Sequence, residues 1–162
     1  MKIAVGSRLP DATLLLIGAN GPEGVAMAAR LKGRNVVIFG LPGAFTGTCS
    51  ISHVPSFMRV AERLREKGVD EVICLSVNDP FVMKAWGEST GAAAKGITFL
   101  ADGDASFTKA IGMEFTAVKD AFYDRSKRYA LYAVDGVVKV LNIGKESRAC
   151  EISGGEAMLE AI

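Results

Sequence analysis

Continuous apolar runs alternate along this chain with segments of helical periodicity. Three such runs, at residues 35–39, 72–77 and 97–101, are typical of strands that are covered on both faces of a sheet. A further apolar run at 11–17 is closed by the turn-rich stretch 18–22. The pattern leaves open whether residues 25–31 pair back with this run or form a helix.

Two long helices are predicted between these strands. In residues 49–67 the apolar positions recur at spacings of three and four: Ile51, Val54, Phe57, Met58, Ala61 and Leu64. That helix ends in Arg65, Lys67 and Gly68, a cationic last turn followed by the usual glycine. Asp79 and Pro80 are an N-cap and a first helical residue, so a second helix starts there and ends before Gly91.

The rest of the chain predicts a short helix, a hairpin and a final helix. Residues 106–111 form the short helix, and Asp135–Gly136 between the apolar runs 129–134 and 137–143 favours a tight hairpin turn. A capping box from Ser153 to Glu156 precedes a last helix. This order predicts an α/β protein with a mixed sheet and helices on both faces. It is the order of the thioredoxin-like fold, although periodicity alone does not single that fold out.

Composition narrows the class of protein. With 162 residues, 49% of them hydrophobic, the chain has the length of one domain spanning residues 1–162, and we find no linker or repeat. The 19 basic and 18 acidic residues leave a net charge of +1, so no nucleic-acid or membrane partner is expected. No secretory signal and no spanning segment is evident, which predicts a cytoplasmic protein.

Three cysteines and a single histidine limit the possible metal chemistry. Cys49, Cys74 and Cys150 lie far apart in the sequence, so no CxxC pair occurs and His53 cannot complete a zinc site. An odd number of cysteines indicates a reducing compartment and at least one free thiol. No GxGxxG or GxxxxGK[ST] motif is present. We therefore expect neither a metal nor an organic cofactor.

The candidate chemistry lies at Cys49, in the first turn of the predicted 49–67 helix. The free N–H groups and the positive end of the helix dipole favour a thiolate there, which is the nucleophilic form. Thr46, three residues earlier, can place its hydroxyl beside the sulfur or a bound oxygen. Alternatively, Thr46 or Thr48 only caps the helix and Cys49 is a packing residue. His53 lies one turn after Cys49, so a Cys–His pair is geometrically possible.

The segment Pro42-xxx-Thr46-xx-Cys49 resembles the active-site signature of the peroxiredoxins. The longer run 42–50 followed by 53–57 is similar to the type II, or atypical two-cysteine, subfamily, which includes plant type II and animal peroxiredoxin-five-like proteins. The stretches 74–86, 99–103 and 125–130 also fit that subfamily. The similarity extends through nearly the whole chain.

This resemblance implies a thiol peroxidase that acts on hydrogen peroxide and alkyl hydroperoxides. Cys49 would attack the peroxide and become a sulfenic acid, Thr46 would orient the peroxide, and Pro42 would shield the sulfur. Arg128 would stabilise the thiolate and the leaving oxygen; without the resemblance it is only a solvated cation in a basic run. His53 would be a supporting residue, and the family predicts a homodimer.

The resemblance leaves the resolving thiol open. Cys150, in a polar segment, corresponds in placement to the resolving cysteine of animal-type members, and Cys74, in an apolar strand, to the second cysteine of plant-type members. The third possibility is an external thiol. Glutaredoxin with glutathione, or thioredoxin, would regenerate the enzyme.

One position departs from the pattern of the subfamily. Gly47 stands where a proline usually follows the threonine, which loosens the loop. We expect the chemistry to survive this change.

The alternative function is a redox sensor or disulfide-relay module with little turnover. A disulfide reductase is weakened by the missing CxxC.

Overall fold

A computed structural model of the chain describes residues 2–144 and 152–162, and for Cys49 only the course of the backbone. The strands are β1 (Thr13–Gly18), β2 (Gly21–Ala26), β3 (Asn35–Gly40), β4 (Glu71–Ser76), β5 (Ile97–Ala101), β6 (Glu114–Ala117), β7 (Phe122–Ser126), β8 (Tyr129–Val134) and β9 (Val137–Ile143). The helices are α1 (Met27–Leu31), α2 (Val54–Glu66), α3 (Pro80–Ser89), α4 (Ser106–Ala110) and α5 (Gly155–Ala161), with short π or 3₁₀ turns η1 (Cys49–His53), η2 (Ala93–Lys95) and η3 (Val118–Asp120).

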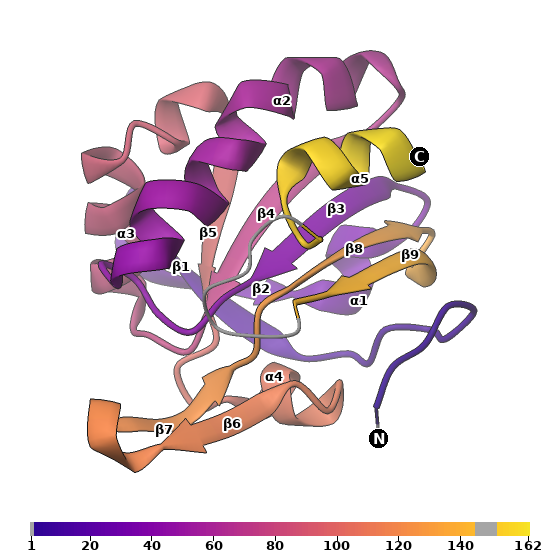
Figure 1. Ribbon diagram of the computed structural model, residues 1–162. Coiled ribbons are helices and arrows are strands. Elements are labelled where there is room, and N and C mark those ends of the chain that lie inside the picture. Colours follow the sequence, from indigo (N-terminus) through magenta and orange to yellow (C-terminus); the bar gives the residue numbers. More distant parts are fainter. Residues whose placement is uncertain (1, 145–151) are drawn as a thin grey trace.

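The core of the molecule is a seven-stranded mixed sheet in the order β2-β1-β5-β4-β3-β8-β9. Strands β3, β4 and β5 are parallel, and β1 and β8 join them as antiparallel neighbours. Helices α2 and α5 lie side by side on one face, with α3 farther along (Figure 1). Helices α1 and α4 pack against the other face. The prediction of a mixed sheet with helices on both faces is confirmed.

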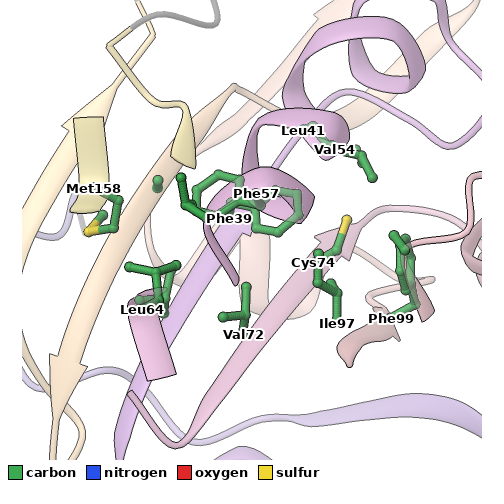
Figure 2. Close-up of a cluster of buried hydrophobic side chains, with 14 of the residues drawn as sticks. Phe39, Leu41, Val54, Phe57, Leu64, Val72, Cys74, Ile97, Phe99 and Met158 are labelled. Atoms are coloured by element: carbon green, nitrogen blue, oxygen red, sulfur yellow. The ribbon is translucent and has the colours of Figure 1, made fainter. Parts of the chain in front are cut away.

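Alternation along the central strands divides the interior into two hydrophobic clusters. On β3, Val37 and Phe39 face the cluster under α2, α3 and α5, whereas Val36 and Ile38 face the cluster under α1 and α4. Both faces of β3 are therefore apolar, as its continuous hydrophobic run predicts. The rings of Phe39 and Phe57 stack at 4.1 Å between centroids. Figure 2 shows this pair at the centre of the first cluster.

Most predicted helix boundaries are confirmed. Asp79 caps α3 by accepting from the Val82 amide at 2.9 Å. Helix α2 ends at Glu66, and Gly68 follows with a φ of 97°. Residues 25–31 adopt both alternatives in turn, because β2 pairs back with β1 and α1 begins at Met27.

The predicted capping box before the last helix is wrong. The N-cap of α5 is Gly154, without a side-chain cap. The Glu156 carboxylate instead binds Arg59 at 2.7 Å, and the Gly155 amide donates to Ser56 Oγ at 2.9 Å. Contacts with α2 thus replace the local cap.

Strands β6 and β7 form a separate two-stranded sheet that the sequence pattern does not predict. This hairpin projects from the end of the molecule at which the parallel strands finish (Figure 1). An ion pair at 3.0 Å between Lys109 and Asp124 ties it to α4, and the Lys127 amide donates to Met113 O at 2.7 Å. The hairpin leads directly into Arg128 and β8.

Candidate active site

The loop between β3 and the first helical turn is held by its own backbone and by Asn78. The Thr46 hydroxyl donates to Gly43 O at 2.7 Å, and Thr46 O accepts from the Ser50 amide at 3.0 Å. Asn78 Oδ1 accepts from the Ala44 amide at 3.0 Å and from Ser76 Oγ at 2.6 Å. Asn78 is a positioning residue that sequence reasoning missed, although it lies in the family-like stretch 74–86.

The direction of the Thr46 hydrogen bond determines what this side chain offers a ligand. A threonine hydroxyl has one proton to donate and two lone pairs. Because the proton goes to Gly43 O, the oxygen presents acceptor lone pairs. It can therefore accept a hydrogen bond from a hydroperoxide O–H.

Phe45 occupies a left-handed backbone conformation, with a φ of 62°. This is uncommon for a bulky residue and indicates strain that the surrounding contacts must sustain. Its ring lies 6.5 Å from that of Trp86, which also donates to Ser50 Oγ at 2.9 Å. Trp86 thus contacts the loop on both sides of Cys49.

The helix that carries Cys49 starts at residue 47, two residues earlier than predicted, and continues from residue 49 as the π turn η1. The backbone of Cys49 therefore lies in the first turn of a helix, where backbone N–H groups favour an anion. One-turn π segments inside helices are frequent at functional sites.

Arg128 and His53 form the buried polar centre of the site. Arg128 is 3% exposed, so the solvated cation that the basic run alone would indicate is not what the structure shows. Its Nη1 lies 3.0 Å from His53 Nδ1, and His53 Nε2 lies 2.9 Å from Ser153 O. A guanidinium only donates and a carbonyl only accepts, so the imidazole is assigned as the neutral Nε2–H tautomer.

Burial and the neighbouring charge keep His53 neutral. Loss of solvation, and then repulsion by the Arg128 guanidinium, lower the pKa of His53 to about 3, although the bond to Ser153 opposes this shift. Both ring nitrogens are occupied within this network. The imidazole therefore does not act as a general base toward Cys49, and its role is to hold Arg128.

One cavity of about 650 Å³ joins these elements. On one side it is lined by the start of the helix and the loop before it, and on the other by the β6–β7 hairpin and Arg128. Its lining residues are Pro42, Thr46, Gly47, Thr48, Phe115, Ala117, Lys119, Asp120, Phe122 and Arg128. Pro42, Thr46 and Arg128, which the resemblance selects, thus face the same space.

The remaining predicted residues lie elsewhere or outside the description. Cys74 is fully buried on β4, paired across the sheet with Phe39 and Phe99. Its side chain lies among apolar groups of the first cluster (Figure 2). Cys150 lies outside the described residues. An added Cβ at Gly47 would meet no atom within 4 Å.

Within residues 2–144 and 152–162, no group of three or more His, Cys, Asp or Glu side chains is placed to hold a metal ion. Within the same ranges, every helix is too short or too polar to cross a bilayer.

Known proteins are similar to this chain over nearly its whole length. Residues 4–159 match the redoxin family. Peroxiredoxin-2C of Oryza sativa subsp. japonica is 45% identical over 161 residues, which are 99% of this chain and 98% of the relative. Peroxiredoxin-2B of Arabidopsis thaliana is 43% identical with the same coverage.

Solved structures agree with these sequence matches. The crystal structure of reduced Prx3 in complex with H₂O₂ from Vibrio vulnificus is 45% identical, covers 98% of both chains and gives a TM-score of 0.91. Peroxiredoxin 5 from Alvinella pompejana is 29% identical, with a TM-score of 0.85 over 98% of this chain and 97% of that one. The likeness confirms the thioredoxin-like fold.

Proposed function

Because the chain belongs to the peroxiredoxin family, in its type II branch, and is a thiol peroxidase, we propose that Cys49 is the residue that attacks the peroxide. Pro42, Thr46 and Arg128 complete the site. The single observation that carries this proposal is the shared cavity that these three residues line next to the backbone of Cys49.

The reaction is a displacement at oxygen. The Cys49 thiolate attacks the terminal oxygen of ROOH, the S–O bond forms, and the O–O bond breaks with its electron pair going to RO. The proton of the hydroperoxide then passes to RO⁻, giving ROH and the ionised sulfenic acid; a proton from solvent completes Cys–SOH. Sulfur loses two electrons and the peroxide gains them.

Two groups of the site match the charges of this reaction. Thr46 accepts from the O–H of the hydroperoxide and so aims the terminal oxygen. Arg128 supplies a permanent cation for the thiolate and the developing RO⁻, and a prepositioned charge of this kind stabilises the transition state more than the ground state. Pro42, buried at the cavity wall, limits access of water.

Rapid mixing of the reduced protein with hydrogen peroxide tests this proposal. Trp86 is the only tryptophan in the chain, and its bond to Ser50 places it beside the reacting turn, so its fluorescence reports the reaction. Wild type should respond in a peroxide-dependent phase that Cys49→Ser abolishes and Cys74→Ser retains. A Cys49→Ser variant with wild-type turnover would contradict the proposal.

For regeneration we propose an external thiol or Cys150 rather than Cys74. The complete burial of Cys74 in the central sheet supports this, because a buried thiol in apolar surroundings is unreactive and could reach Cys49 only through local unfolding. Peptide mass spectrometry after one equivalent of peroxide distinguishes the routes. A Cys49–Cys74 link would overturn the proposal, whereas a Cys49–Cys150 link or a persistent sulfenic acid would support it.

The physiological reductant is proposed to be glutaredoxin with glutathione, or thioredoxin. In either case a thiol R′SH attacks Cys–SOH, releases water and leaves a mixed disulfide, which a second thiol reduces. Turnover measured with each reductant at equal concentration identifies the donor, and turnover with neither would contradict this assignment.

We also propose that the chain forms a homodimer through the apolar surface beside the site. Phe45, Ile51 and Phe81 are 57%, 76% and 62% exposed, and all three lie on elements that contact or contain Trp86 or its partner Ser50. Sedimentation of wild type and of Phe81→Glu tests this. A wild type that is monomeric at micromolar concentration would refute it.

A further inference from the structure

Strand β7 and the residues after it carry two arginines that bind opposite sides of the site. Arg128 contacts the helix side through His53, as described above. Arg125 contacts the loop side, where its Nη1 donates to Pro42 O at 3.1 Å. A Cβ added to Gly43 would lie 2.5 Å from the same Nη1, so the guanidinium rests directly on the loop backbone.

The hairpin fixes the other side of this guanidinium. Arg125 Cζ lies 5.2 Å from the ring centroid of Phe122, within cation–π distance. Phe122 in turn makes an edge-on contact with Phe115, with centroids 6.2 Å apart and planes at 85°. Both rings belong to the hairpin wall of the cavity. Arg125 therefore joins that wall to the loop wall.

The hydrogen bond from Arg125 fixes the carbonyl of Pro42, and the carbonyl of the next residue, Gly43, holds Thr46. Pro42 O is anchored by Arg125, and Gly43 O accepts from both the hydroxyl of Thr46 at 2.7 Å and its amide at 3.4 Å. A shift of the 42–43 backbone would move the proline and the threonine together. The separation of the two cavity walls is set by the same contact.

We propose that Arg125 is a positioning residue for the peroxide reaction, which holds Pro42 and Thr46 at the correct distance from the hairpin wall and from the reacting turn. It acts through the loop and not on the reacting atoms. A guanidinium suits this role because it can stack on an aromatic ring and donate in its own plane at once, whereas an ammonium is a point donor. The inference rests on the proposed function of Cys49, Thr46 and Pro42.

Two rates measured on the same protein test the proposal. Oxidation of Cys49 by hydrogen peroxide needs the loop geometry, whereas alkylation by iodoacetamide needs only the thiolate. We expect Arg125→Met to lower the peroxide rate about 10- to 100-fold, as a small displacement of a reacting geometry does, and to change the alkylation rate by less than about twofold. Arg125→Lys should recover part of the peroxide rate.

Arg8 provides the matched control. Its Nη1 donates to Asp135 O at 2.9 Å and lies 3.1 Å from a Cβ added to Gly136. Like Arg125, it therefore donates to a backbone carbonyl and rests on the glycine that follows that carbonyl. It forms an isolated bridge with Val137 of the far edge strand β9 and lies outside the cavity. Arg8→Met should change neither rate.

The possible outcomes separate this inference from the function on which it rests. An unchanged peroxide rate in Arg125→Met, or a proportional fall of both rates, overturns the positioning role while wild-type activity persists. A wild type in which Cys49 does not react with peroxide overturns the proposed function itself. Selective loss of the peroxide rate, with partial recovery in Arg125→Lys, supports the positioning role.

Discussion

Arg128 donates to Nδ1 of His53 across 3.0 Å, although 75 positions separate the two residues. This bond places a permanent cation beside a neutral imidazole in a buried setting. The same imidazole donates to Ser153 O, which precedes α5. The orientation of the Arg128 guanidinium is thus tied to the packing of the C-terminal helix.

The first prediction concerns how the free energy of unfolding depends on pH. The pKa of His53 is about 3 in the folded chain and near 6.5 when unfolded, so the unfolded chain binds the extra proton between these values. Stability is therefore lost as pH falls below 6.5, with a slope approaching about 1.4 kcal/mol per pH unit. Urea unfolding between pH 7 and pH 5 measures it, above the range in which most carboxylates titrate.

His53→Gln is the matched variant for this measurement. A glutamine amide can accept from Arg128 and donate to Ser153 O, but it does not titrate. Since His53 is the only histidine of the chain, the pH slope above pH 5 should disappear in this variant. An identical slope in both proteins would show that His53 does not carry the effect.

The second prediction distinguishes the effect of the positive charge of Arg128 from the effect of its planar guanidinium geometry. Arg128→Met removes a prepositioned donor and leaves His53 Nδ1 without its described partner, so we expect the peroxide rate to fall by about 100-fold or more. The iodoacetamide rate should fall as well, because the guanidinium also stabilises the thiolate. Arg128→Lys should restore the thiolate but not the full peroxide rate, since an ammonium lacks the planar donor geometry. A peroxide rate in Arg128→Met within the error of wild type would exclude a direct role.

The part of the site that sequence could predict lies within a single stretch. Pro42, Thr46 and Cys49 fall within eight positions, so a local motif contains them. Arg128 is different, because it ends a basic run with Arg125 and Lys127, and only the route of β7 into β8 brings it inside. Local pattern alone therefore describes a surface cation, and the resemblance was needed to select it.

The fold, too, has elements that the sequence pattern predicts and one that it does not. Strands β3, β4 and β5 carry continuous apolar runs and α2 a clear helical period, so each is predicted near its observed position. The sequence pattern does not predict the β6–β7 hairpin, because its strands are only four and five residues long and contain a single fully buried residue, Ser126. Its turn is a 3₁₀ segment closed by Ala121 at a φ of 56°, without the Asn-Gly or Asp-Gly pair that signals a hairpin.

The third prediction concerns the residue that departs from the subfamily. Gly47 is the first helical residue, a position where proline is preorganised, and a Cβ there meets no atom within 4 Å. We expect Gly47→Pro to keep the peroxide rate and to raise the free energy of unfolding by about 0.4–1 kcal/mol, through a less flexible unfolded chain. Gly47→Ala is the control that adds a side chain without the ring. Loss of activity in the proline variant alone would show that the site needs the glycine conformation.

The last prediction concerns a polar atom that the core does not satisfy. Tyr129 pairs with Gly40 across β8 and β3, and its ring fills the space where a Cβ at Gly40 would lie, only 2.2 Å from Cε1. Its hydroxyl is buried without a hydrogen-bond partner among the described residues. Burial raises the pKa of this phenol far above its ordinary range, so the group stays neutral.

Removing that hydroxyl should therefore stabilise the fold. Tyr129→Phe keeps the ring over Gly40 and deletes an unpaired buried polar group, so we expect the free energy of unfolding to rise by about 1–2 kcal/mol. Gly40→Ala is the opposite test, because its methyl group would overlap the tyrosine ring and destabilise the protein by about 1–3 kcal/mol. Urea unfolding at pH 7 measures both variants. A Tyr129→Phe variant less stable than wild type would mean that the hydroxyl is hydrogen-bonded in solution, for instance to a buried water.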